Sequence, residues 1–175
     1  MKTRIVLSVA IFIIVALSLF IFFIPTQDLG KAPDISLNII DGRKIEFSSL
    51  RGKPLLVTFW STSCTSCIKE IPHLVELYKQ LNKDGLEIIG IAMPYDPPNR
   101  VLELTEEREI PYPIALDIEG IALKAFGDIS VTPTSFLIDP VGNIIQQKTG
   151  EMDIEKLRTK IKKLLQTAPA STTIS

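Results

Sequence analysis

The chain contains two cysteines, Cys64 and Cys67, separated by two residues. Residues 55–60, just before them, are almost all apolar, and apolar residues recur every three or four positions just after them. This pattern predicts a buried strand over residues 55–60, followed by an amphipathic helix over residues 65–82. The two thiols are therefore expected where a strand ends and a helix begins.

The start of a helix favours reactive thiol chemistry. The first N–H groups of a helix have no partner within it, and the helix dipole places partial positive charge there. A thiolate at that position is stabilised, so more of the nucleophilic form is present near neutral pH. A second cysteine one turn further along can close a disulfide with the first, which makes the pair a reversible two-electron switch.

Three interpretations of this pair compete. A structural zinc site needs about four Cys or His ligands, whereas the chain has two cysteines and one histidine. An inert disulfide across such a short loop would constrain the unfolded chain little. The redox interpretation is favoured because the Cys-x-x-Cys pair lies between a buried-strand pattern and an amphipathic helix. We expect no metal and no organic cofactor.

The N-terminal residues indicate a membrane location. Residues 5–24 form an apolar run of twenty residues, preceded by Lys2 and Arg4. Such a helix spans about 30 Å, the thickness of a bilayer core, and no small-x-small cleavage site follows it. We expect residues 1–24 to be an uncleaved transmembrane signal anchor, with cleavage as the minor alternative. The positive-inside rule then keeps Lys2 and Arg4 in the cytoplasm and the main domain across the membrane. In a bacterium, this single-pass chain would lie in the inner membrane with its main domain in the periplasm, an oxidising compartment.

The rest of the chain suits one globular domain. Its 175 residues carry a formal net charge of −1, and no basic excess points to nucleic acid. We expect a linker over residues 25–31, a domain over residues 32–166 and a disordered tail over residues 167–175. Within the domain, hydrophobic periodicity and turn residues predict the order β-β-β-α-β-α-β-α-β-β-α, with a helix over about residues 100–109 and Gly85 ending the helix that follows the cysteines. This order is typical of an α/β fold with a mixed sheet.

In these features the chain resembles the TlpA/ResA-like family of membrane-anchored, thioredoxin-fold thiol-disulfide oxidoreductases. The resemblance covers about residues 32–166. It rests on Ala32-Pro33-Asp34, Leu50-Arg51-Gly52-Lys53, Phe59-Trp60, the Cys64–Cys67 pair, Glu70, Pro72 and Val131-Thr132-Pro133-Thr134. It implies a thioredoxin-like fold with an N-terminal β-hairpin and a central helix-and-strand insertion over residues 95–116.

The resemblance also implies roles for matched residues. Cys64 is expected to be the attacking nucleophile and Cys67 the resolving thiol, joined in the oxidised form as the redox-active disulfide. Pro133 is expected to be a cis-proline that faces this disulfide, where the backbone of Thr132 can pair with a substrate strand. The expected catalytic residues are Cys64, Cys67 and Glu70, and the expected substrate-binding residues are Trp60, Thr65, Ser66, Thr132 and Pro133.

Glu70 can also be interpreted from its position. It lies three residues after Cys67 and so shares its face of the expected helix. A carboxyl group half-buried beside thiols would have a raised pKa and could relay protons to Cys67. The alternative is an exposed glutamate that the helix dipole favours. Thioredoxins have a buried aspartate six residues before the first cysteine, where this chain has Thr58, and the only histidine, His73, is expected to be an ordinary helix residue.

The chain departs from the family before and between the cysteines. Ser63 stands where the family usually has an aromatic residue, and Thr65-Ser66 replaces its common Gly-Pro or Glu-Pro pair. Both positions tune the reduction potential of such a pair.

The resemblance implies thiol-disulfide exchange with cysteine-containing protein substrates. It implies a reductase, for example of the haem-site cysteines of apocytochrome c, that receives electrons from a membrane thiol-disulfide donor. The alternatives are a disulfide-donating oxidant, a copper-binding chaperone that uses the same two thiolates, and a non-redox interaction module. A thiol peroxidase would need a lone peroxidatic cysteine, and the paired cysteines argue against it.

Overall fold

The computed structural model describes residues 29–167. The expected transmembrane anchor at residues 1–24 and most of the expected linker at residues 25–31 lie outside this range, as does the expected tail apart from Thr167, which is helical. Within residues 29–167, no helix is both long enough and apolar enough to cross a membrane.

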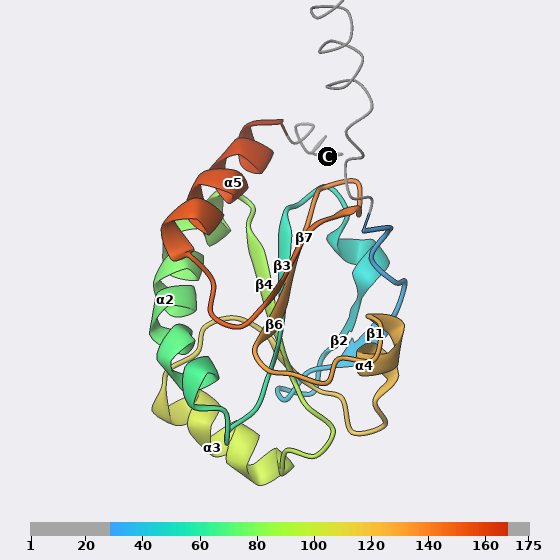
Figure 1. Cartoon of the computed structure of the whole chain (residues 1–175), viewed down its shortest axis with the longest axis vertical. Helices are drawn as coiled ribbons and strands as arrows, with labels where there is room; N and C mark the ends of the chain where they lie inside the picture. The colour runs from blue at the N-terminus through green and yellow to red at the C-terminus, as the bar shows by residue number, and fades with distance from the viewer. Residues whose placement is uncertain (1–28, 168–175) are drawn as a thin grey trace, which may run out of the picture.

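A five-stranded mixed sheet forms the centre of the domain (Figure 1). Its strands lie in the order β5-β4-β3-β6-β7, and their bounds are Leu55–Trp60 for β3, Glu87–Ala92 for β4, Ile114–Leu116 for β5, Thr134–Ile138 for β6 and Ile144–Thr149 for β7. Strands β3, β4 and β5 are parallel, β6 is antiparallel to β3, and β7 is antiparallel to β6. The predicted order of elements and the thioredoxin-like fold are confirmed.

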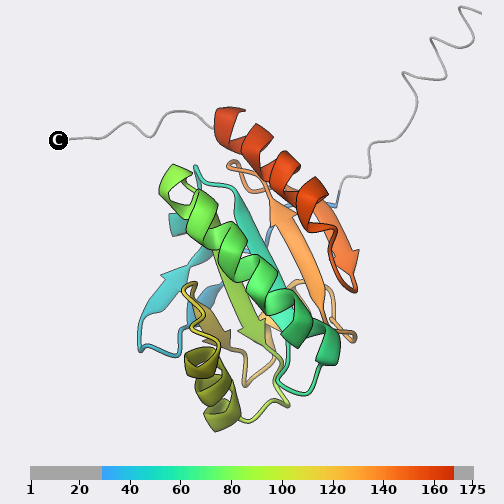
Figure 2. The ribbon, with the colours of Figure 1, turned by 90° about the vertical axis from the view of Figure 1, so that its left-hand side faces the viewer.

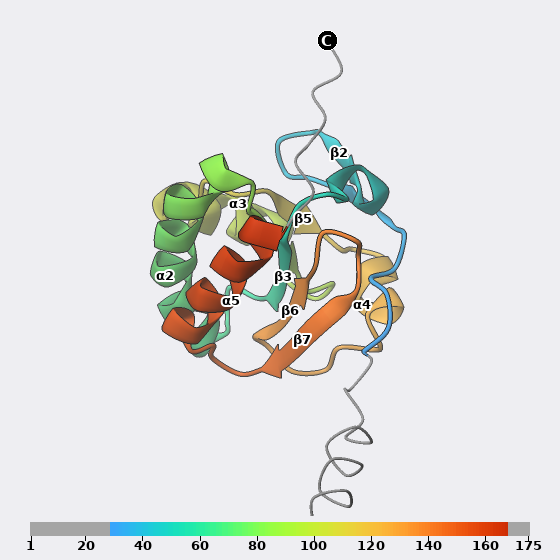
Figure 3. The ribbon, with the colours of Figure 1, turned by 90° about the horizontal axis from the view of Figure 1, so that it is seen from above.

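Different secondary-structure elements cover the two faces of the sheet (Figures 1, 2 and 3). One face carries α2 (Thr65–Leu81), α3 (Pro98–Glu107) and α5 (Ile154–Thr167). The other carries α4 (Ile121–Ala125), the 3-10 turn η1 (Phe47–Leu50) and the hairpin of β1 (Ser36–Asn38) and β2 (Lys44–Glu46). Because side chains alternate along a strand, Val57 and Phe59 of β3 pack toward the second layer, whereas Leu56 and Trp60 pack toward α2.

An apolar stripe holds α2 against the sheet. Leu74 and Leu77 are buried and lie in one cluster with Leu56 of β3 and Ile88 of β4. The helix is followed by the 3-10 turn η2 (Asn82–Asp84) and then by Gly85, whose φ of 112° is a conformation that favours glycine. This packing fixes the first residue of α2 at the carboxyl end of β3, where the two cysteines lie.

Helix α3 is shifted relative to its prediction. It runs from Pro98 to Glu107, about two residues earlier than expected at each end. A proline fits the first turn of a helix because the N–H that it lacks would have no intrahelical partner there. Together with β5, which pairs with β4, this helix forms the expected insertion.

Candidate active site

Cys64 begins the helix that carries the site. Strand β3 ends at Trp60, and Cys64 takes the N-cap position of α2 with an extended backbone conformation. Its Sγ accepts a hydrogen bond from the N–H of Cys67 at 3.2 Å. That N–H is one of the helix's first amide groups, for which an N-cap side chain is the usual partner. The sulfur of Cys64 therefore caps the helix that supports it.

Cys64 and Cys67 form a disulfide, with their Cα atoms 5.2 Å apart. Cys64 is half-buried, whereas Cys67 is 2% exposed. An incoming sulfur atom can reach Cys64 far more easily than Cys67. This difference suits Cys64 as the attacking thiol and Cys67 as the resolving thiol, and the two roles themselves remain predictions.

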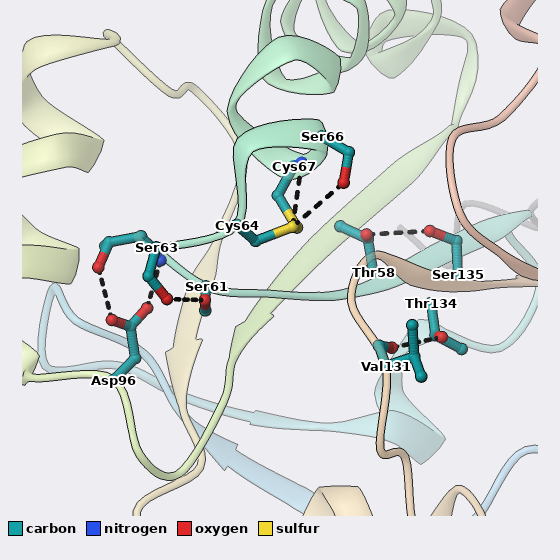
Figure 4. Close-up of a disulfide and its surroundings, with 11 residues drawn as sticks. Thr58, Ser61, Ser63, Cys64, Ser66, Cys67, Asp96, Val131, Thr134 and Ser135 are labelled. Carbon is teal, nitrogen blue, oxygen red and sulfur yellow. Dashed lines mark hydrogen bonds between the residues drawn. A yellow bond between two sulfur atoms is a disulfide. The ribbon is translucent and has the colours of Figure 1, made fainter.

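The hydroxyl group of Ser66 contacts the more exposed sulfur (Figure 4). The Oγ atom of Ser66 lies 3.4 Å from the Sγ atom of Cys64. A pocket of about 520 Å³ opens over Cys64, and the predicted substrate-binding residues Thr65, Ser66 and Thr132 lie together on its wall. Its lining also includes Ser61, Ser63, Lys69, Tyr95 and Glu151.

The Thr132–Pro133 peptide bond is cis, as the resemblance implied. The hydroxyl of Thr134 donates to the carbonyl of Val131 at 2.7 Å, and the N–H of Gly150 donates to the carbonyl of Pro133 at 2.8 Å. These bonds hold the loop at the entry of β6. Thr132 faces the open pocket, whereas Pro133 is buried and lines a small cavity behind the disulfide.

Trp60 lies in the core and not in the open pocket. It is 4% exposed and belongs to the apolar cluster between β3 and α2 that includes Cys67. Its Nε1 has no hydrogen-bond partner among the described residues. Strand alternation turns this side chain toward α2, so Trp60 lines the small cavity behind the disulfide with Pro133 and not the open pocket with Thr65, Ser66 and Thr132. Its role in substrate binding remains a prediction.

Glu70 lines the small cavity behind the disulfide, together with Cys67 and Pro133. It is 4% exposed, and one of its carboxyl oxygens accepts a hydrogen bond from the N–H of Met152 at 2.7 Å. Burial raises the pKa of Glu70 above its ordinary value of 4.5, although the Met152 N–H partly opposes this. Glu70 is thus buried and not exposed, and its role in proton transfer remains a prediction.

Two further residues line the cavity next to Glu70. Thr58, at the position of the thioredoxin aspartate, accepts a hydrogen bond from the hydroxyl of Ser135 at 2.9 Å. Tyr112 comes from the insertion, and its burial, followed by the charge of Glu70, raises the pKa of its hydroxyl. Sequence reasoning missed Tyr112 because no local pattern brings residues of the insertion close to α2.

Asp96 is a second residue that sequence reasoning missed. It is 6% exposed, and its two carboxylate oxygens accept hydrogen bonds from the N–H and the hydroxyl of Thr62, both at 2.6 Å. The loop between β4 and α3 is thereby tied to the turn before Cys64. The sequence did contain a signal for Asp96, because this residue closely follows a predicted parallel strand. The carboxyl ends of parallel strands meet at one edge of a sheet, and ligand-binding residues gather there.

Replacing Glu70 with glutamine should stabilise the oxidised protein at neutral pH. A carboxyl group whose pKa is raised by folding loses stabilisation as pH rises through its folded pKa. Glutamine keeps an oxygen that can accept from Met152 N–H but carries no charge. Urea unfolding of the disulfide form should show a higher free energy of unfolding for Glu70→Gln than for the wild type. The difference should be largest above the pKa of Glu70 in the folded protein and smallest below pH 4.5. The exposed Glu106→Gln is the control, and a gain that did not vary with pH would contradict this account.

Replacing Ser66 with alanine should slow alkylation of Cys64 in the reduced protein. When Cys64 is a thiolate, the Ser66 hydroxyl must be the donor of their hydrogen bond, so its loss destabilises the charged form. Hydrogen bonds contribute about 0.5–1.5 kcal/mol net, which corresponds to a fall in rate of roughly two- to tenfold. Iodoacetamide labelling at neutral pH in a Cys67→Ser background measures this, with Ser63→Ala as the matched control. Equal labelling rates with and without the Ser66→Ala change would show that the Ser66 hydroxyl does not stabilise the Cys64 thiolate.

Known proteins share this chain's sequence features. Residues 30–147 match the AhpC/TSA family. The chain is 35% identical over 139 residues to the thiol-disulfide oxidoreductase ResA of Bacillus thuringiensis subsp. konkukian, which is 79% of either protein. It is 33% identical over 123 residues to ResA of Bacillus subtilis, which is 70% of this chain and 68% of that protein.

Solved structures share its fold. A thiol:disulfide interchange protein of the thioredoxin family from Chlorobium tepidum superposes with a TM-score of 0.71 at 30% identity, over 77% of this chain and 95% of that one. StoA from Bacillus subtilis superposes with a TM-score of 0.63 at 26% identity, over 73% of this chain and 97% of that one. The chain therefore belongs to the AhpC/TSA family of thioredoxin-like proteins and, within it, to the ResA-like thiol-disulfide oxidoreductases.

Proposed function

We propose that this oxidoreductase reduces disulfides of polypeptide substrates on the periplasmic side of a bacterial inner membrane. The observation that carries the proposal is the difference in accessibility between its two cysteines. Cys64 is reachable at the start of α2 within an open pocket, whereas Cys67 is buried beside the carboxyl group of Glu70. An attacking thiol needs access to substrate, and a resolving thiol needs only access to its partner and to a proton acceptor.

The reaction begins when the Cys64 thiolate attacks one sulfur of a substrate disulfide. The substrate S–S bond breaks, a bond joins Cys64 to the substrate, and the other substrate sulfur leaves as a thiolate that takes up a proton. The Cys67 thiolate then attacks the sulfur of Cys64 and releases the second substrate thiol. The substrate has gained two electrons and the cysteine pair has lost them, and a membrane thiol-disulfide donor restores the reduced pair.

Cys67 must lose its proton before it can resolve the mixed disulfide. Glu70 lines the same small cavity as Cys67, and among the described residues that line this cavity it is the one with a carboxyl group. Its raised pKa brings it closer to the pKa of a thiol, so proton transfer between the two is less unfavourable than for an ordinary glutamate. We assign Glu70 the role of proton relay between Cys67 and solvent.

The proposed location and client rest on the N-terminal sequence and on the family resemblance. Residues 1–24 would anchor the chain, and residues 25–31 would hold the domain of residues 32–166 close to the membrane. The TlpA/ResA-like resemblance supports apocytochrome c, with its paired haem-site cysteines, as the client.

The variant Cys67→Ser should trap a covalent complex with an oxidised peptide that carries a Cys-x-x-Cys-His haem-attachment sequence. The attack by Cys64 still occurs, but no thiol remains to resolve the mixed disulfide. Non-reducing electrophoresis and mass spectrometry should detect an adduct that dithiothreitol removes. Cys64→Ser, which leaves only the buried thiol, should form far less adduct. No adduct from Cys67→Ser with excess peptide would contradict the exchange mechanism.

The reduction potential of the Cys64–Cys67 pair should lie near that of thioredoxin, about −270 mV, if the protein is a reductase. Equilibration of the full-length protein with dithiothreitol measures it, and the single tryptophan, Trp60, reports the redox state because it packs in one cluster with Cys67. A value near about −120 mV would instead indicate a disulfide donor. The absence of a reversible couple would overturn the exchange mechanism and favour metal binding by the two thiolates.

A further inference from the structure

Tyr95 is a large side chain that the fold leaves exposed beside the reactive disulfide. It lies on the loop between β4 and α3, is 63% exposed, and lines the pocket over Cys64. Tyrosine combines a broad apolar ring with few rotatable bonds, which makes it common at sites that bind polypeptides. Its position suggests a contact with substrate and not with the core of the domain.

The remainder of the pocket is unsuited to an apolar side chain. Its wall carries the hydroxyl groups of serine and threonine residues and the charged groups of Lys69 and Glu151. Among the described residues that line this pocket, Tyr95 is the only aromatic one. A second apolar side chain, Val131, is 53% exposed and directly precedes Thr132 on the cis-proline loop, but it is not among the residues that line this pocket. An apolar substrate group beside Cys64 would therefore find its contact at the ring of Tyr95.

The loop that carries Tyr95 is fixed in place without substrate. Asp96, the next residue, binds both the N–H and the hydroxyl of Thr62. The N–H of Met93 donates to the carbonyl of Trp60 at 3.0 Å, and the N–H of Asp96 donates to the carbonyl of Met93 at 2.9 Å. In Figure 4, Asp96 reaches the turn before Cys64 and lies on the other side of that residue from Val131. A wall that is already ordered loses less conformational freedom on binding.

We propose that Tyr95 is a specificity-determining residue that packs against a large apolar side chain next to the cysteine of the substrate polypeptide, and that Asp96 is the residue that positions it. The inference rests on the proposed function and narrows its substrate class. Polypeptide disulfides flanked by an apolar residue are reduced faster than those flanked by a small polar residue. The ring of Tyr95 holds the flanking residue while the substrate sulfur meets Cys64.

The test uses two peptides, each with one cysteine in a mixed disulfide with glutathione, that differ only in the residue beside the cysteine. One carries phenylalanine there and the other carries serine. The reduced full-length protein should release glutathione about five times faster from the phenylalanine peptide, as expected for a contact between aromatic rings. Tyr95→Ala should react with the two peptides at nearly equal rates. A loss of folding or of thiol reactivity changes both rates alike and cancels in their ratio.

Two matched variants should keep the rate ratio of the wild type. Tyr95→Phe retains the ring, and Val141→Ala removes an apolar side chain that is 66% exposed in the turn between β6 and β7, at the other end of the sheet. A ratio near one in the wild type, or a ratio that Tyr95→Ala preserves, would overturn the inference. Failure of the wild type to reduce either peptide would instead overturn the proposed function.

Variants of Thr62, the hydrogen-bond donor to Asp96, test whether Asp96 positions Tyr95. Thr62→Val removes the hydroxyl that donates to Asp96 and should lower the rate ratio, whereas Thr62→Ser keeps the hydroxyl and should restore it. A merely structural role would lower both rates without changing their ratio. An unchanged ratio in Thr62→Val would show that Asp96 does not position Tyr95.

Discussion

The chemistry of this protein depends on where helix α2 begins. The hydrogen bond from the N–H of Cys67 to the sulfur of Cys64 exists only because Cys64 is the N-cap residue of that helix. The start of the helix is fixed in turn by the packing of its buried leucines, Leu74 and Leu77, against β3 and β4. An apolar contact about two turns further along the helix therefore decides which sulfur lies at the surface and which is enclosed.

The same packing buries Glu70, although its carboxyl group is more stable in water when charged. This residue lies on the buried face of α2, where a charged carboxylate is less stable than in water. The Met152 N–H, from the segment before α5, satisfies one carboxyl oxygen without neutralising the group. Burial lowers the stability of the charged form and raises the pKa of the carboxyl group, and the Met152 N–H opposes this only in part. A group of this kind is well suited to exchange protons with a thiol, so a local cost in stability accompanies the proposed relay.

The site is assembled from loops that are distant in sequence. Strands β3 and β4 are parallel, so the turn that leads to Cys64 and the loop that carries Asp96 leave the sheet at the same edge. Strand β6 is antiparallel to β3 and begins beside Phe59, so the cis-proline loop that precedes it lies at this edge too. The order and direction of three central strands are thus enough to bring the disulfide, the cis-proline and the Asp96 loop together.

The helices and strands and the reactive cysteine pair could be predicted from the sequence alone. Hydrophobic periodicity located β3 and α2, and the spacing of Cys64 and Cys67 at their junction indicated redox chemistry, because these signals are local. The three-dimensional fold was needed to show that Trp60 lies in the core and that Tyr112 lines the same cavity as Glu70. It was also needed to show that Asp96 accepts hydrogen bonds from Thr62. These contacts join segments far apart in the chain, and they depend on strand order and on which face of the sheet each helix covers. A local pattern records the period of an element but not the neighbour against which that element packs.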